Sequence, residues 1–125
     1  MKLHTVMVIN AIAGVAFGLG FILAPAQTLS LYGHAPTAIL SYMAQLLGAA
    51  LLTFGLLTWV ARNSRDSDAR RAILLALAVG YAIGFVLALI AQIRGVENVL
   101  GWSTVATYLL LALAFGYFRF TKPTS

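Results

Sequence analysis

The chain has 125 residues, of which 62% are hydrophobic and 9% are charged. Soluble domains contain about 45–50% apolar and about 25% charged residues, so this composition, with a mean hydropathy of +0.95, argues against a soluble enzyme and against a disordered chain. The absence of cysteine excludes disulfides, thiolate metal sites and iron–sulfur clusters. The length suits a single domain, residues 1–125.

Four apolar segments follow one another along the chain. We expect helices over about residues 3–24, 37–61, 69–93 and 98–119. Each has about 20 residues or more, the length that a helix needs to cross a hydrocarbon core of about 30 Å. The first segment is also longer than the apolar core of a signal peptide, about 7–15 residues, so we expect it to remain as a span. The sequence therefore predicts an all-α integral membrane protein, a bundle of four transmembrane helices.

The connections between these segments are short. Pro25 ends the first helix, and the uncharged stretch 25–36 is expected to be a loop. Pro36 suits the start of the second helix, where its missing N–H is not needed. Ser67 or Asp68 is a candidate N-cap for the third helix.

The basic residues predict the orientation of the helices. In a four-crossing arrangement only Arg94 lies on one side, and the other seven basic residues lie on the opposite side: Lys2, Arg62, Arg65, Arg70, Arg71, Arg119 and Lys122. Because basic residues concentrate on the cytoplasmic side of membrane proteins, both termini are expected to be cytoplasmic. The net charge of +5 then reflects topology and suits anionic lipid headgroups. It does not indicate a nucleic-acid partner.

Small residues recur on one face of several predicted helices, as in helices that approach each other closely in lipid. The clearest stripe, in the third helix, repeats every four residues: Ala72, Ala76, Gly80, Gly84, Ala88 and Gln92. The first two helices carry others, formed by Asn10, Gly14 and Gly18 and by Ala44 and Gly48. We expect these stripes to pack the chain's own bundle; the alternative is that one of them faces another subunit.

The predicted spans carry no ionisable side chain in their central parts. Such groups usually mark ion and proton pathways, and the glutamate on which proton-coupled small multidrug transporters depend is absent from the first helix. Neither catalytic residues, nor a metal site, nor a cofactor is predicted. His4 and His34 fall on opposite faces of the membrane, so they do not share a haem iron; whether either alone ligates a pigment or metal stays open.

The remaining polar residues suggest a small outward-facing ligand pocket. Its candidate lining consists of Tyr32, His34, Gln45, Gln92, Arg94 and Tyr108. A pocket of this kind suits a lipid, a quinone or another apolar ligand. The alternative is that these groups make interhelical hydrogen bonds, which contribute about 0.6 kcal/mol each on average.

Four short motifs carry a family resemblance: LYGH (31–34), QLLGAALLTFGLLTW (45–59), RDSDARRA (65–72) and GW (101–102). In these the chain resembles small uncharacterised bacterial four-helix membrane proteins, loosely grouped with the DoxX-like superfamily. The resemblance implies four transmembrane helices and a location in the bacterial inner (cytoplasmic) membrane, and it brings no catalytic residues. DoxX-type proteins have been linked to oxidoreductase complexes, and the resemblance gives weak support to such a link here.

Together these features predict a non-catalytic accessory or scaffold subunit that packs in a larger membrane complex. Its partners are then the lipid bilayer and other membrane subunits or further copies of itself. One alternative is a small homo-oligomeric transporter or channel with a pore of Ser, Thr, Gln and Asn side chains. Another is a membrane protein that binds a lipid or quinone.

Overall fold

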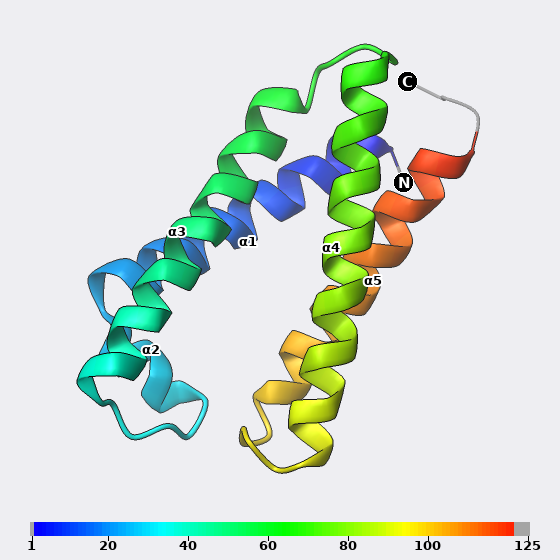
Figure 1. The fold of residues 1–125 in the computed structure, drawn as a ribbon. Coiled ribbons are helices and arrows are strands. Elements are labelled where there is room, and N and C mark those ends of the chain that lie inside the picture. Colours follow the sequence, from blue (N-terminus) through cyan, green and yellow to red (C-terminus); the bar gives the residue numbers. More distant parts are fainter. Residues whose placement is uncertain (1, 122–125) are drawn as a thin grey trace. The chain divides into compact units, whose positions relative to one another are not determined.

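The computed structural model describes residues 2–121, and over these residues the protein is all-α. Five helices follow in order: α1 (Leu3–Leu23), α2 (Pro25–Leu31), α3 (Ala38–Ala61), α4 (Asp68–Ile93) and α5 (Gly101–Phe120) (Figure 1). Lys122, which the charge pattern includes, lies outside the described residues.

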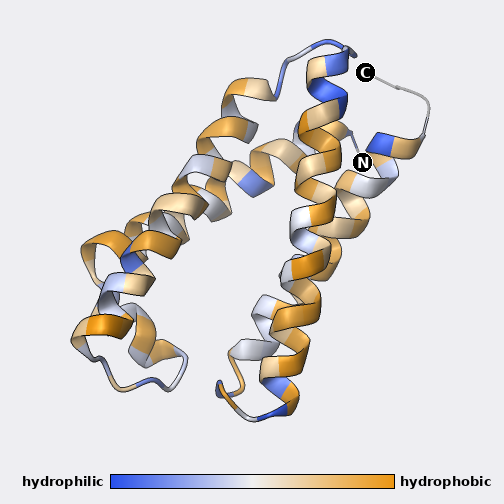
Figure 2. Cartoon of the chain, viewed as in Figure 1, coloured by the Kyte–Doolittle hydropathy of each residue, from blue (hydrophilic) through white to orange (hydrophobic). Residues whose placement is uncertain are grey.

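The four long helices confirm the expectation of four segments long and apolar enough to cross a membrane. Their most apolar windows have mean hydropathies from 1.3 to 2.7, and Figure 2 shows hydrophobic colour along them, with hydrophilic colour gathered at the connections. Helix α5 begins at Gly101 rather than Asn98, because the preceding residues form a turn. In this turn the Asn98 side-chain oxygen accepts a hydrogen bond from the Leu100 N–H at 3.0 Å.

Helix α2 occupies part of the stretch that the sequence analysis expected to be a loop. Pro25 lies in its first turn, where a missing N–H costs no hydrogen bond. The buried Thr28 hydroxyl lies 3.0 Å from the carbonyl oxygen of Gly20 and 2.8 Å from that of Ala24, within donating distance of both. These contacts fold α2 back onto the last turn of α1.

A small apolar core joins the first three helices. It contains Phe21 of α1, Leu29 of α2 and Ala44 of α3, all buried. The start of α3 is held by Thr37, whose hydroxyl oxygen accepts a hydrogen bond from the Leu40 N–H at 3.1 Å. The α2 segment is therefore packed against the ends of both long helices that it connects.

The described chain divides into two compact units. The first, called the α1–α3 unit, is Met7–Val60; the second, called the α4–α5 unit, comprises residues 2–6 and 61–121. Within the second unit, Ser67 is the N-cap of α4, as its side chain accepts a hydrogen bond from the Arg70 N–H at 3.2 Å. Asp68 is instead the first helical residue, where its charge favours the positive end of the helix dipole.

Candidate functional site

The backbones of α1 and α3 approach each other closely. A Cβ atom built on Gly18 would lie 2.8 Å from both the Gly48 carbonyl oxygen and the Leu52 nitrogen, and one on Gly14 would lie 2.7 Å from the Leu51 carbonyl oxygen. These distances leave no room for a larger residue. Two of the stripes predicted to pack helices, in α1 and in α3, therefore face each other in this unit.

The contact face of α3 follows a spacing that the sequence analysis did not use. Facing positions alternate between steps of four and three residues: Ala44, Gly48, Leu51, Gly55 and Thr58. This average period of about 3.5 is that of a left-handed helix pair. A search for this spacing, rather than for strict four-residue steps, would have added Gly55 and Thr58 to the packing residues.

Two polar contacts join α1 to α3, one towards each end. Asn10 Nδ2 donates a hydrogen bond to Thr58 Oγ1 at 3.2 Å, and both side chains are buried, with exposed fractions of 2% and 0%. Gln45 Nε2 donates to the carbonyl oxygen of Ile22 at 3.2 Å. Together with the backbone contact, they fasten the two helices along most of their length.

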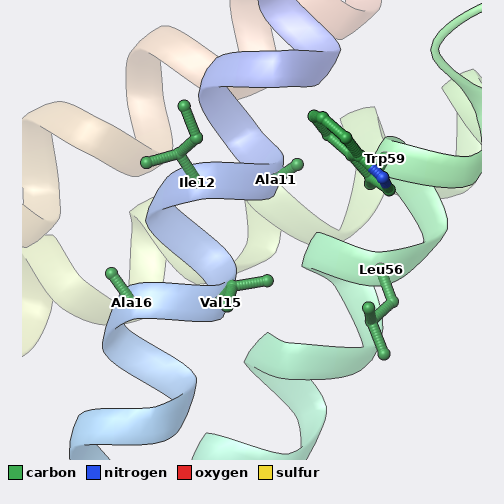
Figure 3. Close-up of a pocket in the computed structure, with 6 residues that line it drawn as sticks. All are labelled: Ala11, Ile12, Val15, Ala16, Leu56 and Trp59. Atoms are coloured by element: carbon green, nitrogen blue, oxygen red, sulfur yellow. The ribbon is translucent and has the colours of Figure 1, made fainter.

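An apolar pocket of about 500 Å³ lies on the α1–α3 pair (Figure 3). Its lining comes from α1 and α3 alone: Ala11, Ile12, Val15, Ala16, Leu56 and Trp59. Among these side chains only the Trp59 indole carries a hydrogen-bonding group. The pocket therefore suits a hydrocarbon group, and it contains none of the residues that the sequence analysis placed in a ligand site.

Aromatic rings form the contact between α4 and α5. The two helices lie side by side and antiparallel (Figure 1). The buried Tyr81 ring lies 5.6 Å from the Tyr108 ring and stacks on Phe115 at 6.0 Å, measured between ring centroids. A Cβ atom on Gly84 would lie 3.2 Å from the Tyr108 ring. In this unit the small size of Gly84 makes room for an aromatic ring, whereas in the α1–α3 unit the small size of Gly14 and Gly18 makes room for the backbone of α3.

The four-residue stripe of α4 does not stay on one face. Gly84 and Ala88 are partly buried, but Ala76 and Gly80 are exposed, and no atom lies within 4 Å of a Cβ built on Gly80. Each four-residue step turns about 40° beyond a full turn, so the stripe rotates by about 160° over four steps. Four of the five buried side chains of α4 are instead spaced by fours and threes, namely Arg70, Leu74, Leu77 and Tyr81; the fifth, Ala78, follows Leu77 directly.

The six candidate ligand residues divide between the two units. Tyr32, His34 and Gln45 belong to the α1–α3 unit, whereas Gln92, Arg94 and Tyr108 belong to the α4–α5 unit. Both amides have local partners, because Gln45 donates to α1 as described and Gln92 Nε2 donates to the Asn98 carbonyl oxygen at 3.0 Å. A shared pocket formed by the six residues stays a prediction.

The two histidines also belong to different units, His4 to the α4–α5 unit and His34 to the α1–α3 unit. Within residues 2–121, no three histidine, aspartate or glutamate side chains are grouped so as to hold a metal ion. The connection between α4 and α5 contains the last acidic residue, Glu97, close in sequence to Arg94 and Asn98.

Charged side chains at the start of α4 contact one another and the preceding turn. Arg70 is 5% exposed, and its Nη1 donates a hydrogen bond to the Ser64 carbonyl oxygen at 3.0 Å. One Asp66 carboxylate oxygen lies 3.8 Å from Arg70 Nη2 and 3.5 Å from Arg71 Nε. A single carboxylate thus lies between two guanidinium groups and fixes the turn that leads into α4.

Comparison with protein families gives one result. A family model described as a domain of unknown function, DUF8292, matches residues 8–123. The chain belongs to the DUF8292 family. The DUF8292 match extends over both units. One family domain therefore includes the close contact of α1 with α3 and the aromatic contact of α4 with α5. Searches of curated proteins and of solved structures gave no match.

Proposed function

We propose that the protein is a multi-pass membrane protein with a structural role, a non-catalytic accessory or scaffold subunit of a larger membrane complex. The observation that carries this proposal is that polar side chains of α1 and α3 form hydrogen bonds between the two helices. The Asn10–Thr58 and Gln45–Ile22 hydrogen bonds fasten one helix to the other. In such spans a polar side chain that acted on a substrate would be expected to face a cavity, and the pocket on this pair is apolar.

The outward faces of the long helices support a membrane setting with further protein contacts. Large apolar side chains are highly exposed on every long helix, for example Leu23 (78%), Val60 (77%), Leu87 (63%) and Leu110 (65%). Soluble monomers rarely expose apolar surface on this scale. Lipid and neighbouring subunits are the two surroundings that cover such faces.

The location proposed is the bacterial inner membrane, with both termini in the cytoplasm. This part of the proposal is supported by the placement of seven of the eight basic residues on one side of a four-crossing arrangement. It is also supported by the short motifs that resemble small DoxX-like membrane proteins. In that setting the exposed helix faces meet lipid or a larger assembly.

Purification of the natively expressed protein in a mild detergent tests the structural role. We expect one or more other membrane proteins to co-purify at a fixed ratio, as measured by size-exclusion chromatography and mass spectrometry. An unrelated four-helix membrane protein expressed at the same level controls for adventitious partners in the micelle. A monodisperse species without a partner, under conditions that preserve known complexes, would contradict the proposal.

The apolar pocket on α1 and α3 favours a second candidate function, binding of a lipid or quinone. Replacing Ala16 by Trp fills this pocket, while the double change Gln45→Leu and Gln92→Leu tests the polar pocket predicted from sequence. Mass spectrometry of the bound lipids and quinones then distinguishes the apolar pocket from the polar one. Loss of a ligand in Ala16→Trp alone supports the apolar pocket; equal ligand content in all three proteins rejects both.

A further inference from the structure

Five arginines gather at one end of the α4–α5 unit. Because α4 and α5 are antiparallel, the start of α4 and the end of α5 lie at the same end (Figure 1). This basic end consists of Arg62, Arg65, Arg70, Arg71 and Arg119. Two acidic residues, Asp66 and Asp68, accompany them, which leaves a formal excess of three positive charges.

The arginines of the basic end divide into a buried group and an outer group. Arg70 is held inside the turn by Ser64 and Asp66, as described above. The Arg71 side chain is 52% exposed and shares the Asp66 carboxylate with Arg70. Arg65 is exposed, and Arg62 is partly exposed. The buried arginine therefore shapes the turn, whereas the side chains of Arg65 and Arg71 are exposed.

We propose that the basic end binds the phosphate group of anionic phospholipid headgroups through Arg62, Arg65 and Arg71. This inference rests on the membrane location proposed above. The position of the charges supports a lipid: Arg71 directly precedes the uncharged part of α4, which extends to Ile93, so these side chains lie where a spanning helix leaves the hydrocarbon. Basic groups at that depth attract anionic headgroups by about fivefold per charge.

A further feature of this end lies at the end of α5. There the Arg119 guanidinium lies 5.3 Å from the Phe120 ring centroid, and Phe120 is exposed. A basic side chain at the end of a spanning helix extends to the level of the headgroups.

The two tryptophans provide reporters for the two ends of the membrane-spanning segments. Trp59 lies three residues before Arg62, and Trp102 lies in the first turn of α5, at the opposite end of its unit from the basic end. Both side chains are exposed. Trp102→Phe leaves Trp59 as the reporter of the basic end, and Trp59→Phe leaves Trp102 as the reporter of the other end.

The experiment measures quenching of each tryptophan in vesicles of phosphatidylcholine and phosphatidylglycerol, with bromine on the acyl chains of one lipid at a time. At Trp59 we expect bromine on phosphatidylglycerol to quench as if that lipid were enriched at least about fivefold, the effect of a single charge, over phosphatidylcholine. At Trp102 we expect no preference. The triple change Arg62→Gln, Arg65→Gln and Arg71→Gln should abolish the preference, whereas Arg94→Gln, a basic residue at the other end, should preserve it.

Salt provides a second readout that needs no charge variant. About 1 M sodium chloride, which shortens the screening length to about 3 Å, should remove the preference in the protein with its arginines intact. Inorganic phosphate at the same ionic strength should act no more strongly than chloride. A stronger effect of phosphate would reassign the site to free phosphate and overturn the lipid assignment.

The outcomes separate this inference from the proposed membrane location. Quenching of both tryptophans without a lipid preference would show insertion and overturn the headgroup site alone. No quenching of either would overturn both proposals. A preference that persists in the triple variant or in high salt would also overturn the site.

Discussion

At the scale of single residues, Gly14 and Gly18 allow the backbones of α1 and α3 to approach each other closely. Helix association in lipid draws little from apolar burial, because lipid tails are as apolar as the side chains. Close backbone approach then becomes the main source of attraction between helices. The free energy of the α1–α3 pair should accordingly be most sensitive at these glycines.

The change Gly18→Ala should destabilise the protein by about 1–3 kcal/mol, the usual cost of overpacking. The added methyl group would meet the Gly48 carbonyl and the Leu52 nitrogen, which are backbone atoms that cannot turn aside. Gly80→Ala is the matched control, because it adds the same group to open space. Unfolding titrations in mixed micelles measure the free energy of unfolding of both variants. Equal losses of stability would contradict close backbone packing between α1 and α3.

The Asn10–Thr58 hydrogen bond should make a small but measurable contribution. A double-mutant cycle with Asn10→Ala and Thr58→Val should give a coupling free energy of about 0.6 kcal/mol and no more than about 1.7 kcal/mol. The cycle removes the other effects of each change, such as the loss of the bond from the Thr58 hydroxyl to the Phe54 carbonyl oxygen. Additive effects of the two changes would show that the contact contributes nothing.

At the scale of elements, α2 is attached to α1 by the Thr28 hydroxyl and by the apolar cluster that contains Leu29 and Phe21. Thr28→Val removes the hydroxyl that lies near the Gly20 and Ala24 carbonyl oxygens but keeps a similar shape. We expect faster amide hydrogen exchange over residues 28–34, with little change in the long helices. Ser30→Ala is the control, because the exposed Ser30 hydroxyl bonds only to Ala26 of its own helix. Equal acceleration in both variants would contradict this role.

The long helices were predictable from sequence, and α2 was not. Twenty apolar residues in a row leave few alternatives to a span, whereas α2 has seven residues and begins with a proline. Helix α1 ends at Leu23, and Pro25 is already the first residue of α2. From the sequence alone, the proline predicts the end of the first helix but not the start of a second one. The attachment of α2 through Thr28 depends on a tertiary contact that no local pattern contains.

The packing faces were predictable in part. The short stripe of Asn10, Gly14 and Gly18 spans two steps of four residues, too few to drift away from α3. The longer stripe of α4 drifts, so Gly84 receives the Tyr108 ring while Gly80 has no neighbour within 4 Å. The candidate ligand residues were chosen for polarity alone, and polarity does not distinguish Gln45, which bonds to α1, from a residue that faces a ligand.

At the scale of the whole molecule, the proposed topology depends on where the charges lie. Among the connections between the long helices, residues 25–37 are uncharged, residues 62–67 carry Arg62, Arg65 and Asp66, and residues 94–100 carry Arg94 and Glu97. In a four-crossing arrangement this places seven of the eight basic residues on one side. On this arrangement residues 25–37 and 94–100 lie on one side of the membrane, and residues 62–67 lie on the other. This is the central claim, since both the structural role and the headgroup site require it.

The most direct test uses the absence of cysteine from the native chain. Single cysteines are introduced at three exposed positions, Ala35→Cys, Asn63→Cys and Val99→Cys, and labelled with a membrane-impermeant maleimide in intact cells. We predict labelling of the cysteines at 35 and 99 from outside, and labelling at 63 only after the membrane is opened. Labelling of all three in intact cells, or of 35 and 63 together without 99, would contradict a protein of four crossings.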